Sequence, residues 1–198
     1  MHIYIFLATA VTALAVENPI FARALGLGRD TMFMKTPMSG ILLGGALTWM
    51  TTVSSLFVAL FNFALAGTSH AAITRPLLYL AGVALVYAIT AKELLPRIKL
   101  PDYRRKLQEA LPVATFNTAL FGAFYISVTQ NFGAFQTVGY ALGTGAGYTV
   151  AILAIYFARK RLSVSPVPRS FRGLPILLVY LGLISLALYG LIGRVLPT

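Results

Sequence analysis

The sequence has no cysteine among its 198 residues, and only 11% of them are charged, with five acidic side chains in all. Without cysteine the chain has no disulfides, no thiolate metal sites and no ligands for a cysteine-bound iron–sulfur cluster. Its two histidines, His2 and His70, lie near the ends of apolar segments and are too few for a metal centre. Because no grouping of Ser, His and Asp stands out either, we predict no catalytic residue, no metal and no cofactor.

The sequence has few charged residues and many long apolar runs. Hydrophobic residues make up 58% of the sequence and its mean hydropathy is +0.81, whereas a soluble domain carries about 25% charged residues. A membrane-spanning helix needs about 20 mostly apolar residues. Six segments meet that requirement, at about 2–21, 38–66, 76–95, 107–128, 133–158 and 174–196. The sequence therefore predicts an all-α integral membrane protein of six helices, forming one domain over residues 1–198 in contact with membrane lipid.

The basic residues are spread unevenly over the connections, and this predicts the orientation in the membrane. The formal net charge is +11, and 14 of the 16 Lys and Arg residues lie in or beside the connections after the first, third and fifth segments. They are Arg23, Arg29, Lys35, Lys92, Arg97, Lys99, Arg104, Arg105, Lys106, Arg159, Lys160, Arg161, Arg169 and Arg172. Basic loops stay in the cytoplasm, so we expect both termini outside a bacterial-type inner (cytoplasmic) membrane. Since membrane topology explains the charge, no nucleic-acid partner is predicted.

Six helices divide into two sets of three, at about 1–100 and 101–198, and an odd number per set makes the two sets run in opposite senses. The two sets also share a short sequence similarity. VEN at 16–18 precedes ALGLG at 24–28, and TFN at 115–117 precedes ALFG at 119–122. Each pair places an Asn before small residues in the first helix of its set, so we predict two inverted repeats.

The polar stretch at the end of the first segment has two interpretations. Glu17 and Asn18 precede Pro19, which removes a backbone donor and crowds the preceding turn. In the first interpretation the helix is broken here, and both polar side chains face the protein interior as part of an ion path. In the second, the helix simply ends at Glu17, and its carboxylate lies among the lipid headgroups.

Polar residues also interrupt the third and fourth segments. Thr118 can bond back along its own helix, whereas Asn117 needs a partner on another helix or in a cavity. Glu93 lies near the end of the third segment, with Arg97 four residues on. It is either a polar group of an ion path or a solvated helix end with an i,i+4 ion pair.

Three glycines of the fifth segment, Gly139, Gly143 and Gly147, recur at every fourth position. Small residues at this spacing let two membrane helices approach closely, so we predict that they form a helix-packing face. A nucleotide-binding loop would follow a strand, and no strand is expected here.

Several of these stretches together resemble a known family of membrane subunits. They are VEN with LGLG, LPVATFNTALFG at 111–122, and the run from GTGAGYTVA through ARKRL and VPRSFRG. They are similar to the six-helix subunits of the Rnf/Nqr family, above all to the A subunit of Rnf and the equivalent E subunit of the sodium-pumping NADH:quinone oxidoreductase. The resemblance implies an inverted-repeat fold with broken first and fourth helices. It also implies a homologous membrane partner of opposite orientation within a redox complex.

The sequence departs from this family at the residues that would bind metal. The resemblance implies an iron–sulfur cluster between two subunits, held by two cysteines from each. The matching positions here are Gly28 and Thr118, and neither is a suitable ligand. The first hypothesis is therefore a subunit of an Rnf/Nqr-like complex that serves as scaffold, ion path or docking subunit without its own cluster. The second is a non-redox transporter, or a channel-like pair of identical chains, that uses Glu17, Asn18, Asn117 and Thr118.

Overall fold

The computed structural model describes residues 2–28, 36–67, 70–163 and 168–192, and in these ranges all regular structure is helical. The elements are α1 His2–Val11, η1 Thr12–Val16, α3 Pro37–Ala64, α4 Ala71–Ile89, η2 Thr90–Leu94, η3 Leu95–Arg97, α5 Pro101–Thr115, α6 Thr118–Thr129, α7 Ala134–Ser163, η4 Arg169–Phe171 and α8 Leu174–Ile192. Arg29, Lys35, Arg194 and the end of the predicted sixth segment lie outside the described residues.

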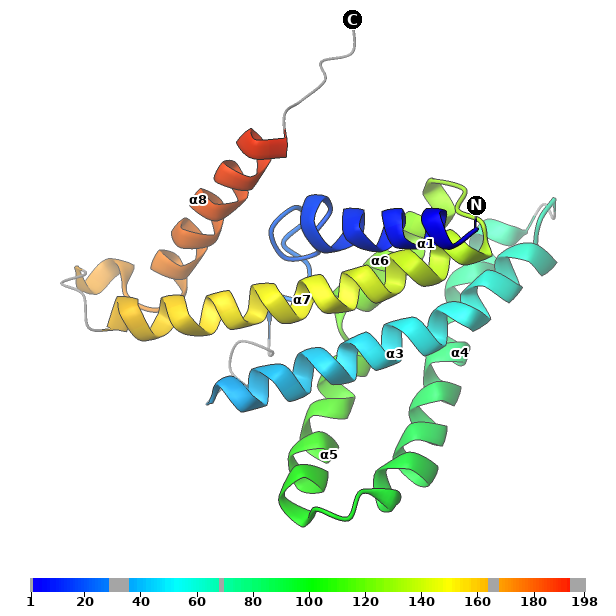
Figure 1. The fold of residues 1–198 in the computed structure, drawn as a ribbon, viewed down its shortest axis with the longest axis horizontal. Coiled ribbons are helices and arrows are strands. Elements are labelled where there is room, and N and C mark those ends of the chain that lie inside the picture. Colours follow the sequence, from blue (N-terminus) through cyan, green and yellow to red (C-terminus); the bar gives the residue numbers. More distant parts are fainter. Residues whose placement is uncertain (1, 29–35, 68–69, 164–167, 193–198) are drawn as a thin grey trace, which may run out of the picture.

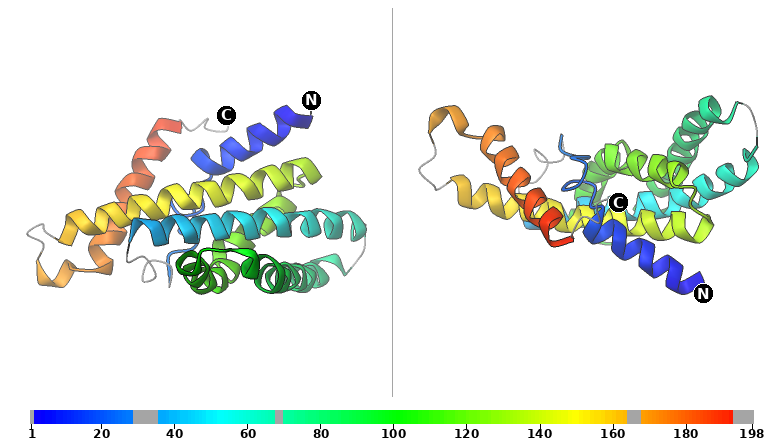
Figure 2. Two further views of the ribbon diagram at one scale, coloured as in Figure 1. Left: turned by 60° about the horizontal axis from the view of Figure 1, so that its bottom comes forward. Right: turned by 90° about the horizontal axis from the view of Figure 1, so that it is seen from above.

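Two long helices, α3 and α7, form the centre of the protein. They lie side by side and run in opposite directions, while α1 lies along α7 (Figure 1; Figure 2). Helices α4 and α5 pack on α3 away from α1 (Figure 1). The most deeply buried large side chains include Leu47 and Met50 of α3 and Tyr140 and Tyr148 of α7. Helix α8 leaves α7 at an angle (Figure 1), and it adds Leu177 and Leu181 to the core.

Local sequence fixes where α3 begins. Thr36 precedes the helix, and its hydroxyl accepts a hydrogen bond from Ser39 N at 3.2 Å. The Ser39 hydroxyl in turn accepts from Thr36 N at 3.1 Å, which completes a capping box. Pro37 occupies the first helical position, where its missing N–H is not needed. The start of α3 therefore agrees with the predicted start at about residue 38.

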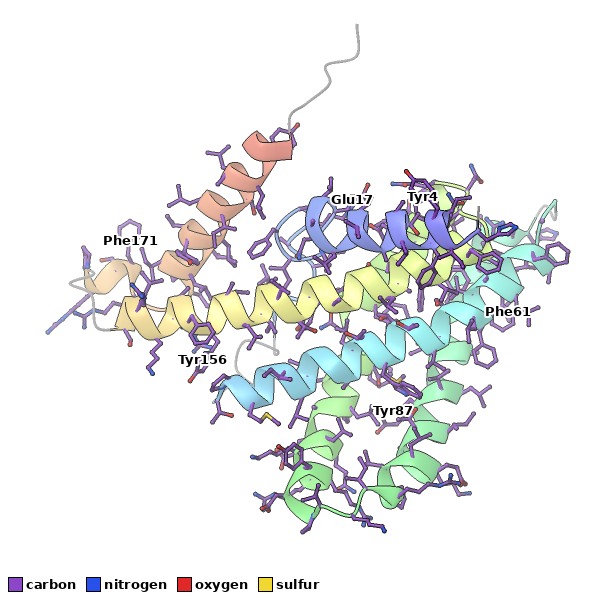
Figure 3. All side chains as sticks on the ribbon, in the orientation of Figure 1. Tyr4, Glu17, Phe61, Tyr87, Tyr156 and Phe171 are labelled. Atoms are coloured by element: carbon purple, nitrogen blue, oxygen red, sulfur yellow. The ribbon has the colours of Figure 1, made fainter. Side chains whose placement is uncertain are left out.

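The described helices have the lengths and surfaces of a membrane protein. Three are long and apolar enough to cross a membrane: Pro37–Ala64, Ala71–Arg97 and Ala134–Ser163. Helices α5 and α6 together make a fourth candidate, bent by 42° at the break between them, whereas α1 with η1 and α8 are apolar but shorter. Large apolar side chains such as Tyr4 and Phe171 point outward (Figure 3). The chain is thus an all-helical membrane protein, and six crossings with both ends outside remain a prediction.

Four of the predicted segments differ from the helices observed. The fifth, α7, runs to Ser163 rather than ending at about 158. The first helix ends at Val16 rather than near Phe21, because Pro19 has no N–H with which to continue it. The third begins at Ala71 and holds Pro76 in its second turn, where proline removes only one helical hydrogen bond. The fourth predicted segment is two helices, since the chain breaks between α5 and α6. The first of these starts in the polar stretch at Pro101, which is favoured at a helix start.

Candidate functional site

Helix α1 packs on α7 through the three predicted packing glycines. A Cβ at Gly139 would lie 2.6 Å from Thr9 Oγ1, and a Cβ at Gly147 would lie 2.9 Å from the Leu14 carbonyl oxygen. At Gly143 a Cβ would lie 2.8 Å from Ala10 Cα and closer still to the Ala10 carbonyl oxygen. The two helices therefore meet backbone to backbone, with the same spacing on each.

Replacing Gly143 by alanine is expected to lower the free energy of unfolding by about 2 kcal/mol, because the new methyl overlaps a backbone that cannot yield locally. The matched control is Gly182→Ala in α8, where a Cβ would meet nothing within 4 Å. That change should stabilise the helix by about 0.5–1 kcal/mol, because alanine has the higher helix propensity. Thermal unfolding in a neutral detergent measures both. Equal effects would show that α1 does not pack closely at Gly143.

Asn18 occupies the turn that follows η1, and its amide is fully used. It is only 3% exposed. Its Nδ2 donates to the Leu14 carbonyl at 3.1 Å and to the Gly147 carbonyl of α7 at 2.9 Å. Its Oδ1 accepts from the N–H groups of Ile20 at 3.1 Å and Phe21 at 3.3 Å. Asn18 therefore satisfies the backbone that Pro19 leaves without helical partners and ties this turn to α7.

Asn117 plays the corresponding part at the break between α5 and α6. It is also 3% exposed. Its Oδ1 accepts from Ala119 N at 2.7 Å and so caps α6, and its Nδ2 donates to the Tyr148 hydroxyl at 3.3 Å. In both turns the asparagine oxygen binds the N–H two residues further on. Their amide nitrogens donate to Gly147 and Tyr148, which are consecutive residues of α7, so both breaks are hydrogen-bonded to this helix.

The two breaks also contact each other. Gly26 N donates to Thr118 Oγ1 at 2.8 Å, and Leu25 lies against Gly122 of α6. Gly26 has φ +81°, and a Cβ there would lie 2.6 Å from a ring carbon of Tyr148 and 2.9 Å from Asn117 Oδ1. Only glycine fits this position, because the backbone is left-handed and the space is already filled. The segment after α1 is therefore joined directly to the start of α6.

A cavity of about 300 Å³ opens beside this junction. It is lined by Gly26, Gly28, Pro112, Val113, Phe116, Asn117 and Thr118. Gly28 and Thr118, which match the ligand positions of the resembled family, thus lie on one cavity. They do not fit an iron–sulfur cluster, because glycine has no side chain and the Thr118 oxygen already accepts from Gly26 N. No thiolate is available anywhere in the sequence, so no electron-transfer step through such a group is assigned to this chain.

Glu17 makes its contacts apart from that cavity. Its Oε2 accepts from the Tyr140 hydroxyl at 2.7 Å and pairs with Arg23 Nη2 at 3.2 Å, while Oε1 lies 3.5 Å from Gln130 Nε2. The Glu17 side chain is 25% exposed, and it lies at the end of the first helix (Figure 3). The ion path of the first interpretation stays a prediction. The helix does end here, and the carboxylate also bonds to α7 and to the connection after α6.

Glu93 lies in η2, away from the paired breaks. Its Oε2 is 3.7 Å from Arg97 Nη2, and the two side chains are 57% and 79% exposed. This is the arrangement of a solvated helix end with an i,i+4 ion pair. The structure therefore brings Gly28, Asn117 and Thr118 together and leaves Glu93 outside the group.

Sequence reasoning did not single out Gly26, Tyr140 or Tyr148 as part of the site. The Tyr148 hydroxyl accepts a hydrogen bond from Asn117, and the Tyr140 hydroxyl donates one to Glu17. Gly26 N donates to Thr118 and so joins the two breaks. A signal for the tyrosines was present, since both lie in the glycine-rich run GYALGTGAGYTVA. A hydroxyl within an apolar helix needs a partner. Gly26 lies in the small-residue stretch ALGLG at 24–28, but its positive φ becomes visible only in three dimensions.

Known proteins match this chain over nearly its whole length. The family description "Rnf-Nqr subunit, membrane protein" matches residues 6–195. A protein from Pectobacterium atrosepticum, named as the A subunit of an ion-translocating oxidoreductase complex, is 32% identical over 189 residues, covering 93% of this chain and 95% of the relative. Relatives with the same name from Syntrophotalea carbinolica (28% over 185 residues, 93% and 95% covered) and Glaesserella parasuis (29% over 194 residues, 98% and 97% covered) are similar as well. The chain belongs to the Rnf-Nqr family of membrane subunits.

Proposed function

We propose that this chain is a membrane subunit of an Rnf-type ion-translocating oxidoreductase complex, acting as a scaffold, ion-path or docking subunit without an iron–sulfur cluster of its own. Relatives that span almost the same length carry the name of that complex. One observation carries the more specific part of the proposal. The two breaks meet through the Gly26–Thr118 hydrogen bond, beside a cavity lined by both matched ligand positions, Gly28 and Thr118.

The proposed membrane arrangement follows the charge distribution. Six spans in a bacterial inner membrane place the basic connections in the cytoplasm and both termini outside. Residues 1–100 and 101–198 then form inverted repeats, and the matching roles of Asn18 and Asn117 support that division. The partner is a homologous membrane subunit of opposite orientation or a second copy of this chain, together with other subunits of the complex.

The test is affinity purification of the tagged full chain from its own membranes in a mild detergent. We expect flavin-containing redox subunits and a homologous membrane subunit to co-purify with the chain. The control is a tagged, unrelated membrane protein of similar abundance. Recovery of the chain alone, as a stable pair of identical copies without redox subunits, would contradict membership of a redox complex.

The absence of cysteine favours a second candidate, a non-redox transporter. Broken helices that meet in an inverted repeat build substrate and ion sites in many transporters, and here Asn18, Asn117 and Thr118 lie around α7 at such breaks. This candidate predicts that the isolated pair of identical chains, placed in vesicles, carries an ion or solute without any electron donor. The first candidate predicts no such transport.

Replacing Glu17 by glutamine is expected to reduce ion-coupled activity or assembly of the complex several-fold while changing stability by no more than about 1 kcal/mol. Glutamine can still accept from Tyr140, but it loses the half-exposed ion pair with Arg23, and such pairs contribute little to stability. Ion-coupled turnover of the purified complex and its subunit stoichiometry measure the effect. Glu93→Gln, which removes an exposed carboxylate from η2, is the control and should leave both unchanged. If Glu17→Gln also leaves both unchanged, Glu17 only ends a helix.

A further inference from the structure

A second cavity, of about 390 Å³, lies where α7 and α8 join, far along α7 from the paired breaks. Figure 1 shows the two helices meeting at this end of the molecule and then diverging. The lining residues are Arg159, Leu162, Ser163, Arg172, Gly173, Ile176 and Leu177. This cavity therefore combines two guanidinium groups with an apolar wall, and both helices contribute to it.

The polar side of the cavity suits a phosphate group. Arg159 comes from the end of α7 and Arg172 from the segment before α8, and arginine presents a planar fork of donors that matches phosphate oxygens. Ser163 adds no donor, because its hydroxyl already donates to the Lys160 carbonyl at 2.8 Å. The cavity also reaches Gly173, just before α8, and the N-terminus of a helix favours an anion.

The surroundings add positive charge. Lys160 and Arg161 lie in the last turn of α7, and Arg169 lies in η4 before α8. The last acidic residue of the sequence is Glu109, so the whole of α7, η4 and α8 carries no carboxylate side chain. An anion is therefore attracted to this end of the molecule by several charges, in addition to the two arginines of the cavity.

The apolar side of the cavity suits a hydrocarbon chain. Leu162, Ile176 and Leu177 form the wall. A free phosphate ion or a nucleotide would leave this apolar wall uncovered. A membrane lipid covers it with an acyl chain while its headgroup meets the arginines.

We propose that the junction of α7 and α8 is a binding site for an anionic phospholipid. The phosphate binds Arg159 and Arg172, and an acyl chain lies against Leu162, Ile176 and Leu177. The lipid thus fills the cavity at the junction of α7 and α8. The basic connection beside the site places it in the cytoplasmic leaflet.

The test compares lipids on the purified full chain in a neutral detergent. We expect phosphatidylglycerol to raise the thermal midpoint by about 5 °C at saturation, and equal amounts of phosphatidylcholine or inorganic phosphate to leave it unchanged. The double variant Arg159→Gln/Arg172→Gln should lose this response and retain fewer phosphatidylglycerol molecules per chain after delipidation, as counted by mass spectrometry. The matched control, Arg104→Gln/Arg105→Gln, removes the same charge from α5 and should keep both properties.

Three results would overturn the proposal. They are an undiminished phosphatidylglycerol response in the cavity variant, an equal loss in the α5 control, and an equal stabilisation by inorganic phosphate. The first two would indicate general attraction of anionic lipid to a basic surface, and the third a site for a free anion. If the cavity variant does not fold, Arg159→Lys/Arg172→Lys replaces it, because lysine keeps the charge without the bidentate fork. That variant should retain phosphatidylglycerol more weakly, and unchanged retention would count against the site.

Discussion

Replacing Gly26 by alanine is expected to be among the most damaging single changes in this chain, lowering the free energy of unfolding by about 4 kcal/mol. Two effects add. A non-glycine residue is strained at φ +81°, and the new methyl would lie 2.6 Å from a ring carbon of Tyr148 and 2.9 Å from Asn117 Oδ1. For a chain of this size the loss corresponds to roughly 10 °C in the thermal midpoint.

A matched control separates the two effects. Gly67 has the same φ of +81°, but a Cβ there would meet nothing within 4 Å. Gly67→Ala should therefore show the backbone strain alone, about 1–2 kcal/mol. The difference between the two variants measures how closely the first break is held against Asn117 and Tyr148. If both variants lose the same amount, the segment after α1 is not packed against α6 and α7.

Replacing Asn18 by alanine is expected to lower the free energy of unfolding by about 3 kcal/mol, because buried polar groups lose their partners. The N–H groups of Ile20 and Phe21 would lose their acceptor, and the bond to the Gly147 carbonyl would be lost as well. Neither N–H can return to a regular helix while Pro19 stays in place. Thermal unfolding of the full chain in detergent measures the loss.

Asn62 provides the comparison for this change. It is a partly buried asparagine of α3 whose side-chain oxygen accepts from the Tyr79 hydroxyl. Asn62→Ala removes one side-chain bond and should lower stability by about 1 kcal/mol. An Asn18→Ala effect no larger than that of Asn62→Ala would mean that Asn18 does not organise the turn after η1.

The sequence predicted the location of the break regions better than their geometry. VEN and TFN were matched by sequence similarity alone. In the structure the side-chain oxygen of each asparagine, Asn18 and Asn117, accepts from the N–H two residues further on. Their amide nitrogens donate to Gly147 and Tyr148 of α7. The match has a physical basis, since an asparagine can accept and donate at once where a helix stops. The fourth-segment break was expected, yet its place between α5 and α6 depends on Asn117 capping a new helix, which apolar periodicity alone does not reveal.

Long-range contacts were beyond sequence reasoning. Glu17 is bonded to Gln130 and Tyr140, which are 113 and 123 positions away, and no local pattern indicates such pairs. Similarly, Gly28 and Thr118 were matched to family positions one by one. That they line one cavity follows from how the segment after α1 folds onto α6, a property of the packed structure.

We propose that this Rnf-Nqr chain joins its two broken segments by direct protein contacts and carries no cluster of its own. The most direct measurement is the iron and acid-labile sulfide content of the purified full chain, recorded together with its visible spectrum before and after reduction. We expect iron and sulfide far below one atom per chain and no absorbance that bleaches on reduction. Stoichiometric iron and sulfide with a bleachable spectrum in the chain alone would contradict it.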